Sequence, residues 1–264
     1  MQKLHIVARS IAIFGAFALT SCSLVEPPIH RGTLAGSAET EQYYGPVLTI
    51  AEDTPAESAT ALQQIADETL QVMTSNRFLE NAIAMSGQYP ELFINGKLGY
   101  RSAAWTASNF QDPVGDYRFN ATPITLGEKR AFTGYDRLGW RMQVPQETLT
   151  LWESEDVVER SCAIRIIAHE TSHTLVDMDG SIVMVDDGAD AFSSRRTGTT
   201  GSYVMAGLAQ CTWLQNQGRI GEKEVPACVA EFYKAPVFPW ERGQFADNKC
   251  DEFPGDTPIG KVGP

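Results

Sequence analysis

The chain has 264 residues, which is enough for one sizeable domain or two small ones. Its 43% hydrophobic and 20% charged residues are the balance of an ordinary globular protein. The formal net charge is -12, and nucleic acid binding needs clustered cations that neutralise phosphates, so no nucleic acid partner is expected. Nothing in the composition defines an oligomeric state.

The N-terminal residues have the pattern of an export signal. Cationic residues precede a short apolar run at residues 11–19, which is too short for a comfortable membrane span. The sequence Leu19-Thr20-Ser21-Cys22 follows. It resembles the lipobox of bacterial lipoproteins, which implies that Cys22 carries a lipid and holds the protein at a membrane. The next residue is Ser23 and not Asp, and by the same resemblance this favours the cell envelope, at the outer membrane facing the periplasm.

Three regions are expected along the chain. Residues 1–21 are a signal peptide. Residues 22–54, which contain Pro27-Pro28 and scattered glycine, serine and threonine, are a lipidated cysteine followed by a flexible tether. Residues 55–264 then form one α+β domain. At its start, the apolar residues of 56–86 recur mostly at helical spacing.

A small sheet is expected in the middle of the domain. Asn95-Gly96 is a favoured tight hairpin turn between two short apolar runs. Further extended segments are predicted at residues 100–107, 117–126 and 138–144. Residues 147–152 alternate threonine with leucine, which predicts a half-buried strand whose edge could pair with a peptide. A helix is expected from Ser154, as its N-cap, to Val176. Two more helices are predicted at residues 203–215 and 225–233.

The helix predicted after Ser154 contains His169-Glu170-Thr171-Ser172-His173, an HExxH motif. Residues four apart share one face of a helix, so both imidazoles can bind one metal ion. Neutral imidazole suits zinc, and the Glu170 carboxylate is placed to take a proton from a metal-activated water and to pass it to the leaving group. The other two histidines, His5 and His30, lie in the signal and the tether. The motif therefore contains both histidines of the folded domain.

A carboxylate is expected as the third metal ligand, because the domain has no further histidine. Asp179 follows His173 by six residues, the spacing at which metzincins place their third ligand, and Met205 would then be a candidate for the Met-turn of that group. The metzincin pattern needs a glycine three residues after the second histidine. This chain has Val176 there, and a β-branched residue resists the required backbone geometry.

The second alternative is the Asp-x-x-x-Asp sequence from Asp186 to Asp190. It is similar to the Glu-x-x-x-Asp of gluzincins, in which the first carboxylate binds zinc and the second accepts a hydrogen bond from a ligand histidine, fixing its tautomer. Asp186 would then be the third metal ligand and Asp190 would support a histidine. Asp187 competes with Asp186 for the ligand role.

The two segments resemble those of a bacterial family assigned as zinc metallopeptidases, which carries HELGHALID followed by EDxADxFA. Here they read HETSHTLVD from His169 to Asp177 and DDGADAFS from Asp186 to Ser193. The resemblance covers about residues 164–192, and the family's first Glu is Asp186 here. Other departures are Thr171, Ser172, Thr174, Val176 and Ser193. The resemblance implies a minimal zincin-like α+β fold, with the HExxH helix packed against a small sheet, a helical C-terminal part, Zn2+ as cofactor and a peptide or protein as substrate.

The four cysteines after Cys22 predict two disulfides, because an exported protein meets an oxidising compartment. Three pairings are possible. Cys211 and Cys228 flank a turn-like stretch and could staple two helices, which would leave Cys162 to pair with Cys250.

The sequence thus predicts a zinc-dependent peptide-bond hydrolase, a metallopeptidase with Glu170 as general base. The alternative is a non-catalytic envelope lipoprotein whose metal site is structural or vestigial. Zincins often use a downstream side chain to stabilise the oxyanion. The candidates for that role here are Arg195, Arg196 and Tyr203.

Overall fold

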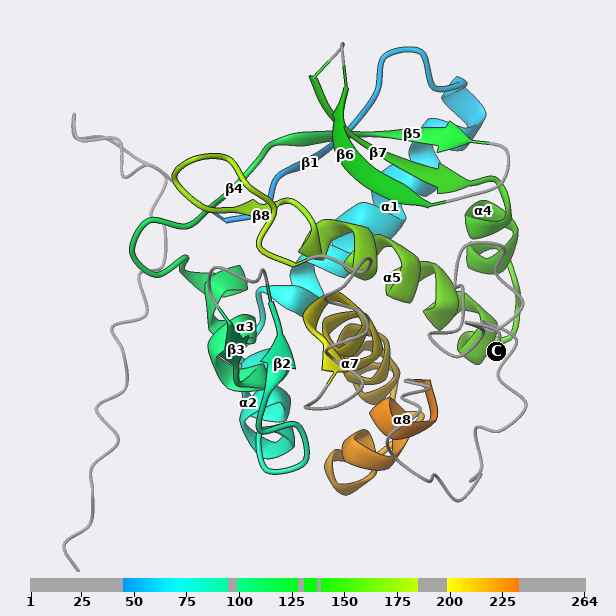
Figure 1. Cartoon of the computed structure of the whole chain (residues 1–264). Coiled ribbons are helices and arrows are strands. Elements are labelled where there is room, and N and C mark those ends of the chain that lie inside the picture. The colour runs from blue at the N-terminus through cyan, green and yellow to red at the C-terminus, as the bar shows by residue number, and fades with distance from the viewer. Residues whose placement is uncertain (1–44, 95–98, 128–130, 137–138, 185–198, 233–264) are drawn as a thin grey trace, which may run out of the picture. The chain divides into compact units, whose positions relative to one another are not determined.

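A four-stranded mixed sheet and a group of helices form the protein, and Figure 1 shows their arrangement in a computed structural model. The structure describes residues 45–94, 99–127, 131–136, 139–184 and 199–232. These residues all belong to one structural unit, Tyr43–Pro264. The α+β class expected from the sequence is confirmed.

The first elements are one short strand and two helices. α1 (Ala56–Met73) and α2 (Asn76–Met85) confirm the helical prediction for residues 56–86. α2 begins after Ser75, whose hydroxyl oxygen accepts a hydrogen bond of 3.1 Å from the Phe78 N–H and so caps the helix. β1 (Leu48–Ile50) pairs with the main sheet. It lies inside the segment expected to be a tether, so the folded part begins earlier than predicted.

The main sheet contains β1, β5 (Thr122–Gly127), β7 (Gly139–Pro145) and β6 (Phe132–Asp136), in that order. β1, β5 and β7 are parallel, and β6 is the antiparallel outer strand. Ile124 and Met142 are paired in register and fully buried, which places the inner face of the sheet in the core. The extended segments predicted at residues 117–126 and 138–144 are therefore confirmed.

Two smaller sheets lie outside the main one. β2 (Leu92–Phe93) pairs antiparallel with β3 (Tyr100–Arg101) and parallel with β9 (Thr199–Thr200). β4 (Arg118–Phe119) pairs antiparallel with β8 (Leu175–Val176). The chain reversal expected between β2 and β3 is present, while Asn95 and Gly96 lie outside the described residues.

The strand predicted for residues 100–107 is wrong after its first two residues. Ser102 ends β3 and caps α3 (Ala103–Gln111), because its side chain accepts a hydrogen bond of 3.1 Å from the Trp105 N–H. The apolar run that indicated a strand instead packs one helical face, with Ala103, Ala107 and Phe110 fully buried.

The strand predicted for residues 147–152 is also wrong, since α4 (Glu147–Trp152) is a helix. Its buried residues are Thr148, Leu149 and Trp152, which is helical spacing, so the alternation of threonine and leucine has no structural counterpart. Six residues are too few to distinguish the two periodicities. Glu147 in the first turn favours the helix electrostatically.

The helical part is built around α5 (Val157–Ser172) and α7 (Gly201–Asn216). α5 packs against α1, α4 and α7 and also contacts β6 and β7 of the main sheet (Figure 1). α7 is buried along almost all of its length. α8 (Val225–Phe232), preceded by the short 3-10 helix η1 (Glu222–Glu224), packs on α7. These elements confirm the two helices predicted at residues 203–215 and 225–233.

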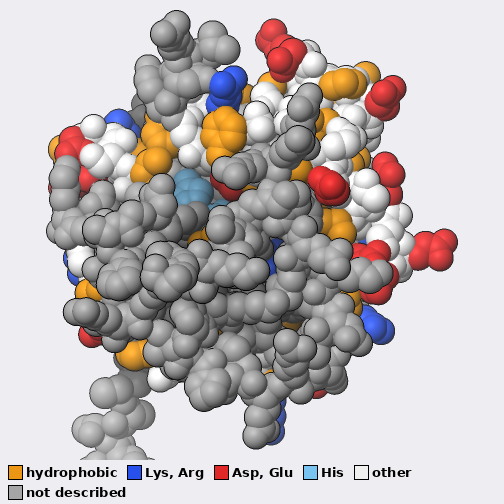
Figure 2. Space-filling model, turned by 45° about the vertical axis from the view of Figure 1, so that its right-hand side comes forward, with side chains coloured by type: hydrophobic (Ala, Val, Ile, Leu, Met, Phe, Trp, Pro, Cys, Tyr) orange, Lys and Arg blue, Asp and Glu red, His pale blue; other side chains and the backbone are white. Residues whose placement is uncertain are grey.

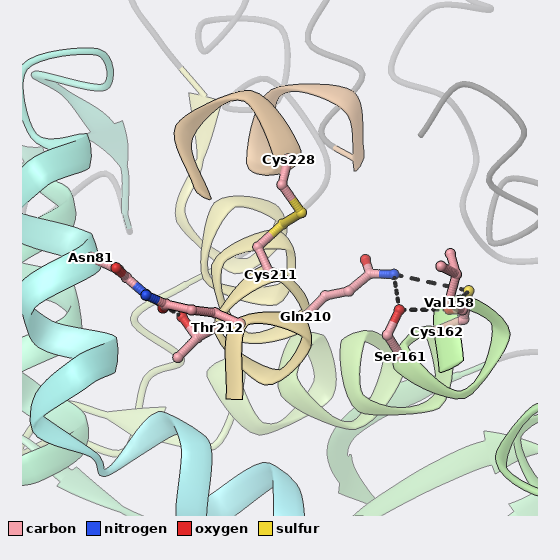
Figure 3. Close-up of a disulfide and its surroundings, with 9 residues drawn as sticks. Asn81, Val158, Ser161, Cys162, Gln210, Cys211, Thr212 and Cys228 are labelled. Atoms are coloured by element: carbon pink, nitrogen blue, oxygen red, sulfur yellow. Dashed lines mark hydrogen bonds between the residues drawn. A yellow bond between two sulfur atoms is a disulfide. The ribbon is translucent and has the colours of Figure 1, made fainter. Parts of the chain in front are cut away.

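The disulfide expected between Cys211 and Cys228 joins α7 to α8, with Cα atoms 5.9 Å apart (Figure 3). Cys162 on α5 is disulfide-bonded as well. Its expected partner, Cys250, lies outside the described residues. No helix in the described part of the chain is long and apolar enough to cross a membrane.

Candidate metal centre

The HExxH motif lies at the C-terminal end of α5. The helix begins after Asp156, whose carboxylate accepts a hydrogen bond of 2.8 Å from the Val158 N–H; Ser154, the expected N-cap, lies two residues earlier. The helix ends at Ser172 and not at Val176 as predicted. His173 is its C-cap and keeps helical dihedral angles (φ -74, ψ -14), so the two histidines are still one helical turn apart.

The two imidazoles converge. Their Nε2 atoms are 3.3 Å apart, and the rings are 4.9 Å apart between centroids at 84°. Two nitrogen ligands about 2.05 Å from a tetrahedral zinc ion lie about 3.3 Å from each other. The observed separation therefore fits a shared metal ion. It also fits an N–H···N hydrogen bond between the rings, in which one proton occupies the place of the metal.

The Nδ1 atom of His173 is 2.7 Å from the main-chain oxygen of Met184. A carbonyl oxygen only accepts hydrogen bonds, so Nδ1 carries the proton and donates it. In the neutral ring, the Nε2 atom of His173 is then unprotonated, and its lone pair points toward His169. Histidine ligands of metals are usually oriented by such a bond from the second ring nitrogen.

A tight turn after the helix brings Met184 to this position. β8 is followed by a reversal at Asp177–Gly180, where Gly180 has φ 83 and donates its N–H to the Asp177 oxygen at 3.0 Å. Val183 N–H then donates to the Leu175 oxygen at 3.0 Å, which holds the returning chain against β8. The residue types of this segment do not predict its role in orienting His173. Asp179-Gly180, a common turn dipeptide, was the one available signal.

The catalytic candidate Glu170 is almost completely buried, with 3% of its surface exposed, while His173 is 8% exposed and His169 is half-buried. Figure 2 shows histidine at the surface in a hollow with hydrophobic side chains at its rim. Burying a carboxylate is costly unless its surroundings compensate, and such groups are concentrated at functional sites. One helix end thus combines a buried carboxylate and a buried imidazole with a second imidazole, that of His169, which is half-buried.

The described residues contain no group of three or more His, Cys, Asp or Glu side chains that could hold a metal. Asp179, the metzincin-type candidate, is exposed, and its carboxylate accepts hydrogen bonds from the Ser181 N–H at 3.0 Å and hydroxyl at 2.5 Å. Both of these hydrogen bonds lie within the turn, and the role of Asp179 as a ligand stays a prediction. Met205, the Met-turn candidate, is a fully buried residue of α7. The remaining candidates Asp186, Asp187, Asp190, Arg195 and Arg196 lie outside the described residues.

Tyr203 is the candidate that the structure does bring to the motif. It lies in the first turn of α7, and its ring centroid is 4.5 Å from that of His169, with the ring planes at 58°. Tyr203 is half-buried, like His169. The contact therefore joins α7 to the end of α5 that carries the HExxH motif.

The site's geometry is defined by this chain's own residues. Comparisons with known proteins do not add to it: no family model, no curated protein and no solved structure matches the chain.

Proposed function

We propose that the protein is a zinc-dependent hydrolase of peptide bonds, with His169 and His173 as metal ligands and Glu170 as general base. The observation that supports this proposal most is the pair of Nε2 atoms 3.3 Å apart, one of them on a ring whose other nitrogen is engaged by Met184. Two histidine ligands of a tetrahedral zinc ion need this separation of their nitrogens, and the bond to Met184 orients the His173 ring as a ligand histidine is usually oriented.

The residues of the site have distinct tasks in this proposal. When bound, zinc would polarise the scissile carbonyl and lower the pKa of a coordinated water to about 7. Glu170 follows the ligand His169 directly and takes the proton of the attacking water, which it then delivers to the leaving nitrogen. Its burial keeps bulk water from the carboxylate and strengthens its electrostatic interactions.

We propose Asp186 as the third ligand, with Asp187 as the alternative. A catalytic zinc site normally has three protein ligands. Asp186 follows Met184 by two residues in the sequence, and the Met184 carbonyl accepts the hydrogen bond from His173. Because His173 already donates to Met184, the histidine that Asp190 would support is His169.

An extended peptide would lie along β6. This strand is one of the two outer strands of the main sheet in the described part of the chain, β1 being the other, and it contacts α5, the helix that carries the motif. The unpaired main-chain groups of an outer strand can bind a peptide by adding it as a further strand. β6 replaces the segment 147–152, which was predicted for this role and is a helix.

We also propose that the domain works in the bacterial cell envelope, held to a membrane by a lipid on Cys22. Disulfides persist in oxidising compartments and are rare in the cytosol. The Cys211–Cys228 disulfide and the disulfide-bonded Cys162 support an exported protein. Cys22 itself lies outside the described residues.

The test of the proposed reaction is cleavage of unfolded casein by the full chain loaded with zinc. Glu170→Gln keeps the size of the side chain but removes the base, so we expect cleavage to fall about 10²–10⁴-fold with zinc content unchanged. Glu153→Gln, at an exposed position just after α4, is the matched control and should cleave like the wild type. Equal cleavage by Glu170→Gln and the wild type would contradict the mechanism. Zinc binding without any cleavage by the wild type would favour the non-catalytic alternative.

A further inference from the structure

α5, which carries the HExxH motif, packs against α7. Two interactions define how these helices align. At one end, the Gln210 side-chain N–H donates a 2.8 Å hydrogen bond to the Ser161 hydroxyl oxygen, and both residues are fully buried (Figure 3). At the other end, the Tyr203 ring lies 4.5 Å from the His169 ring.

These two contacts are consistent with each other along the helices. Ser161 and His169 are eight residues apart on α5, or about 12 Å, and Gln210 and Tyr203 are seven residues apart on α7, or about 10.5 Å. The two helices are therefore antiparallel here, and a bond at one end sets the position of the aromatic contact at the other. A hydrogen bond between fully buried side chains is suited to fixing the alignment of two helices. If the helices slid past each other, its polar atoms would stay buried in the core without a partner.

The two histidines are consequently held by different means. The His173 ring is oriented by its hydrogen bond to Met184. The His169 ring has an aromatic neighbour whose plane is tilted by 58° at a centroid distance within the range of favourable aromatic pairs. An aromatic side chain has few rotatable bonds, so a ring on a buried helix restricts the rotation of the imidazole against it.

We propose that Tyr203 is a positioning residue: its ring, placed by α7, holds the His169 imidazole in the orientation that directs Nε2 at the Nε2 of His173. This inference rests on the proposed metal site and deepens it. The hydroxyl group of Tyr203 is not required for this role, whereas the ring is. Phenylalanine should therefore replace tyrosine, and leucine should not.

The metal-dependent test measures zinc affinity of the full chain by competition with a chromophoric chelator. We expect Tyr203→Leu to weaken zinc binding about 10-fold, the effect of losing a group that orients a ligand. Tyr203→Phe should bind zinc like the wild type. Tyr117→Leu is the matched control, because Tyr117 is also half-buried and makes an aromatic contact, with Trp105 at 5.7 Å. Cobalt in place of zinc should give an altered visible spectrum only in Tyr203→Leu.

A second readout needs no metal. In the zinc-free chain, the imidazole proton signals of His169 should be shifted by the Tyr203 ring, and this shift should vanish in Tyr203→Leu and persist in Tyr203→Phe. Unchanged His169 signals in Tyr203→Leu, or equal zinc affinity and cobalt spectra in Tyr203→Leu and the wild type, would overturn the inference while leaving the metal site intact. If the wild type binds no zinc although the His169 signals respond to Tyr203→Leu, the proposed function fails and the positioning contact stands.

Discussion

The His173 ring donates a hydrogen bond of 2.7 Å from Nδ1 to the main-chain oxygen of Met184, eleven residues later in the chain. The bond joins the end of the HExxH helix to the segment that returns beside β8. It orients one of the two histidines in the metal-free protein. Folding therefore already orders a side chain that the proposed metal site needs in this orientation.

This bond predicts the tautomer of His173 in the zinc-free protein. Long-range proton–nitrogen correlation spectra at neutral pH should show His173 with a protonated Nδ1 and an unprotonated Nε2. His30, in the segment expected to be a tether, serves as the internal reference and should show the mixture of tautomers of a solvated imidazole. A His173 signal with the proton on Nε2 would mean that the ring does not donate to Met184.

The turn that returns the chain to His173 should be sensitive to Gly180→Ala. Gly180 has φ 83, and a Cβ there would meet no atom within 4 Å, so the cost comes from the backbone alone. We expect the free energy of unfolding in urea to fall by about 1–2 kcal/mol, and zinc affinity to fall with it. Gly87→Ala is the control, since Gly87 also has open space around it but no positive φ. Equal stability of the two variants would show that the turn is not constrained.

The disulfide between α7 and α8 should contribute to stability through the unfolded state. Cys211 and Cys228 are 17 residues apart, and closing a loop of this length stabilises a protein by about 3 kcal/mol. The double variant Cys211→Ala and Cys228→Ala should lose about this amount in urea unfolding under non-reducing conditions. Under reducing conditions the wild type should lose at least as much, because Cys162 is disulfide-bonded too. An unchanged free energy of unfolding in the double variant would contradict the prediction.

Much of the fold was predictable where long stretches repeat one periodicity. α1 and α2 are such stretches, and their buried residues follow helical spacing, whereas α7 is buried along almost all of its length. Short segments were not predictable, because residues 147–152 fit a strand and a helix equally well. The end of α5 was not predictable for a related reason. Leu175 and Val176 are apolar, which suits a buried helix and a buried strand alike, and it is their pairing with β4 that makes them a strand.

The side chains of the candidate site were predictable from the sequence, but the groups that orient them were not. His169, Glu170 and His173 are recognisable because their residue types and spacing carry the chemistry. The partner of His173 is the main-chain carbonyl of Met184. Every residue has such a group, so no side-chain pattern points to it. The contact of Tyr203 with His169 depends on how α7 packs on α5, which is a tertiary relationship between residues 34 positions apart.

The central claim is that His169 and His173 together hold a zinc ion, and zinc titration of the full chain by calorimetry tests it most directly. The account predicts one zinc ion per wild-type chain, loss of that binding in His169→Ala and in His173→Ala, and unchanged binding in the control His30→Ala. Wild-type protein that binds no zinc, or His169→Ala and His173→Ala variants that bind zinc as tightly as the wild type, would contradict it.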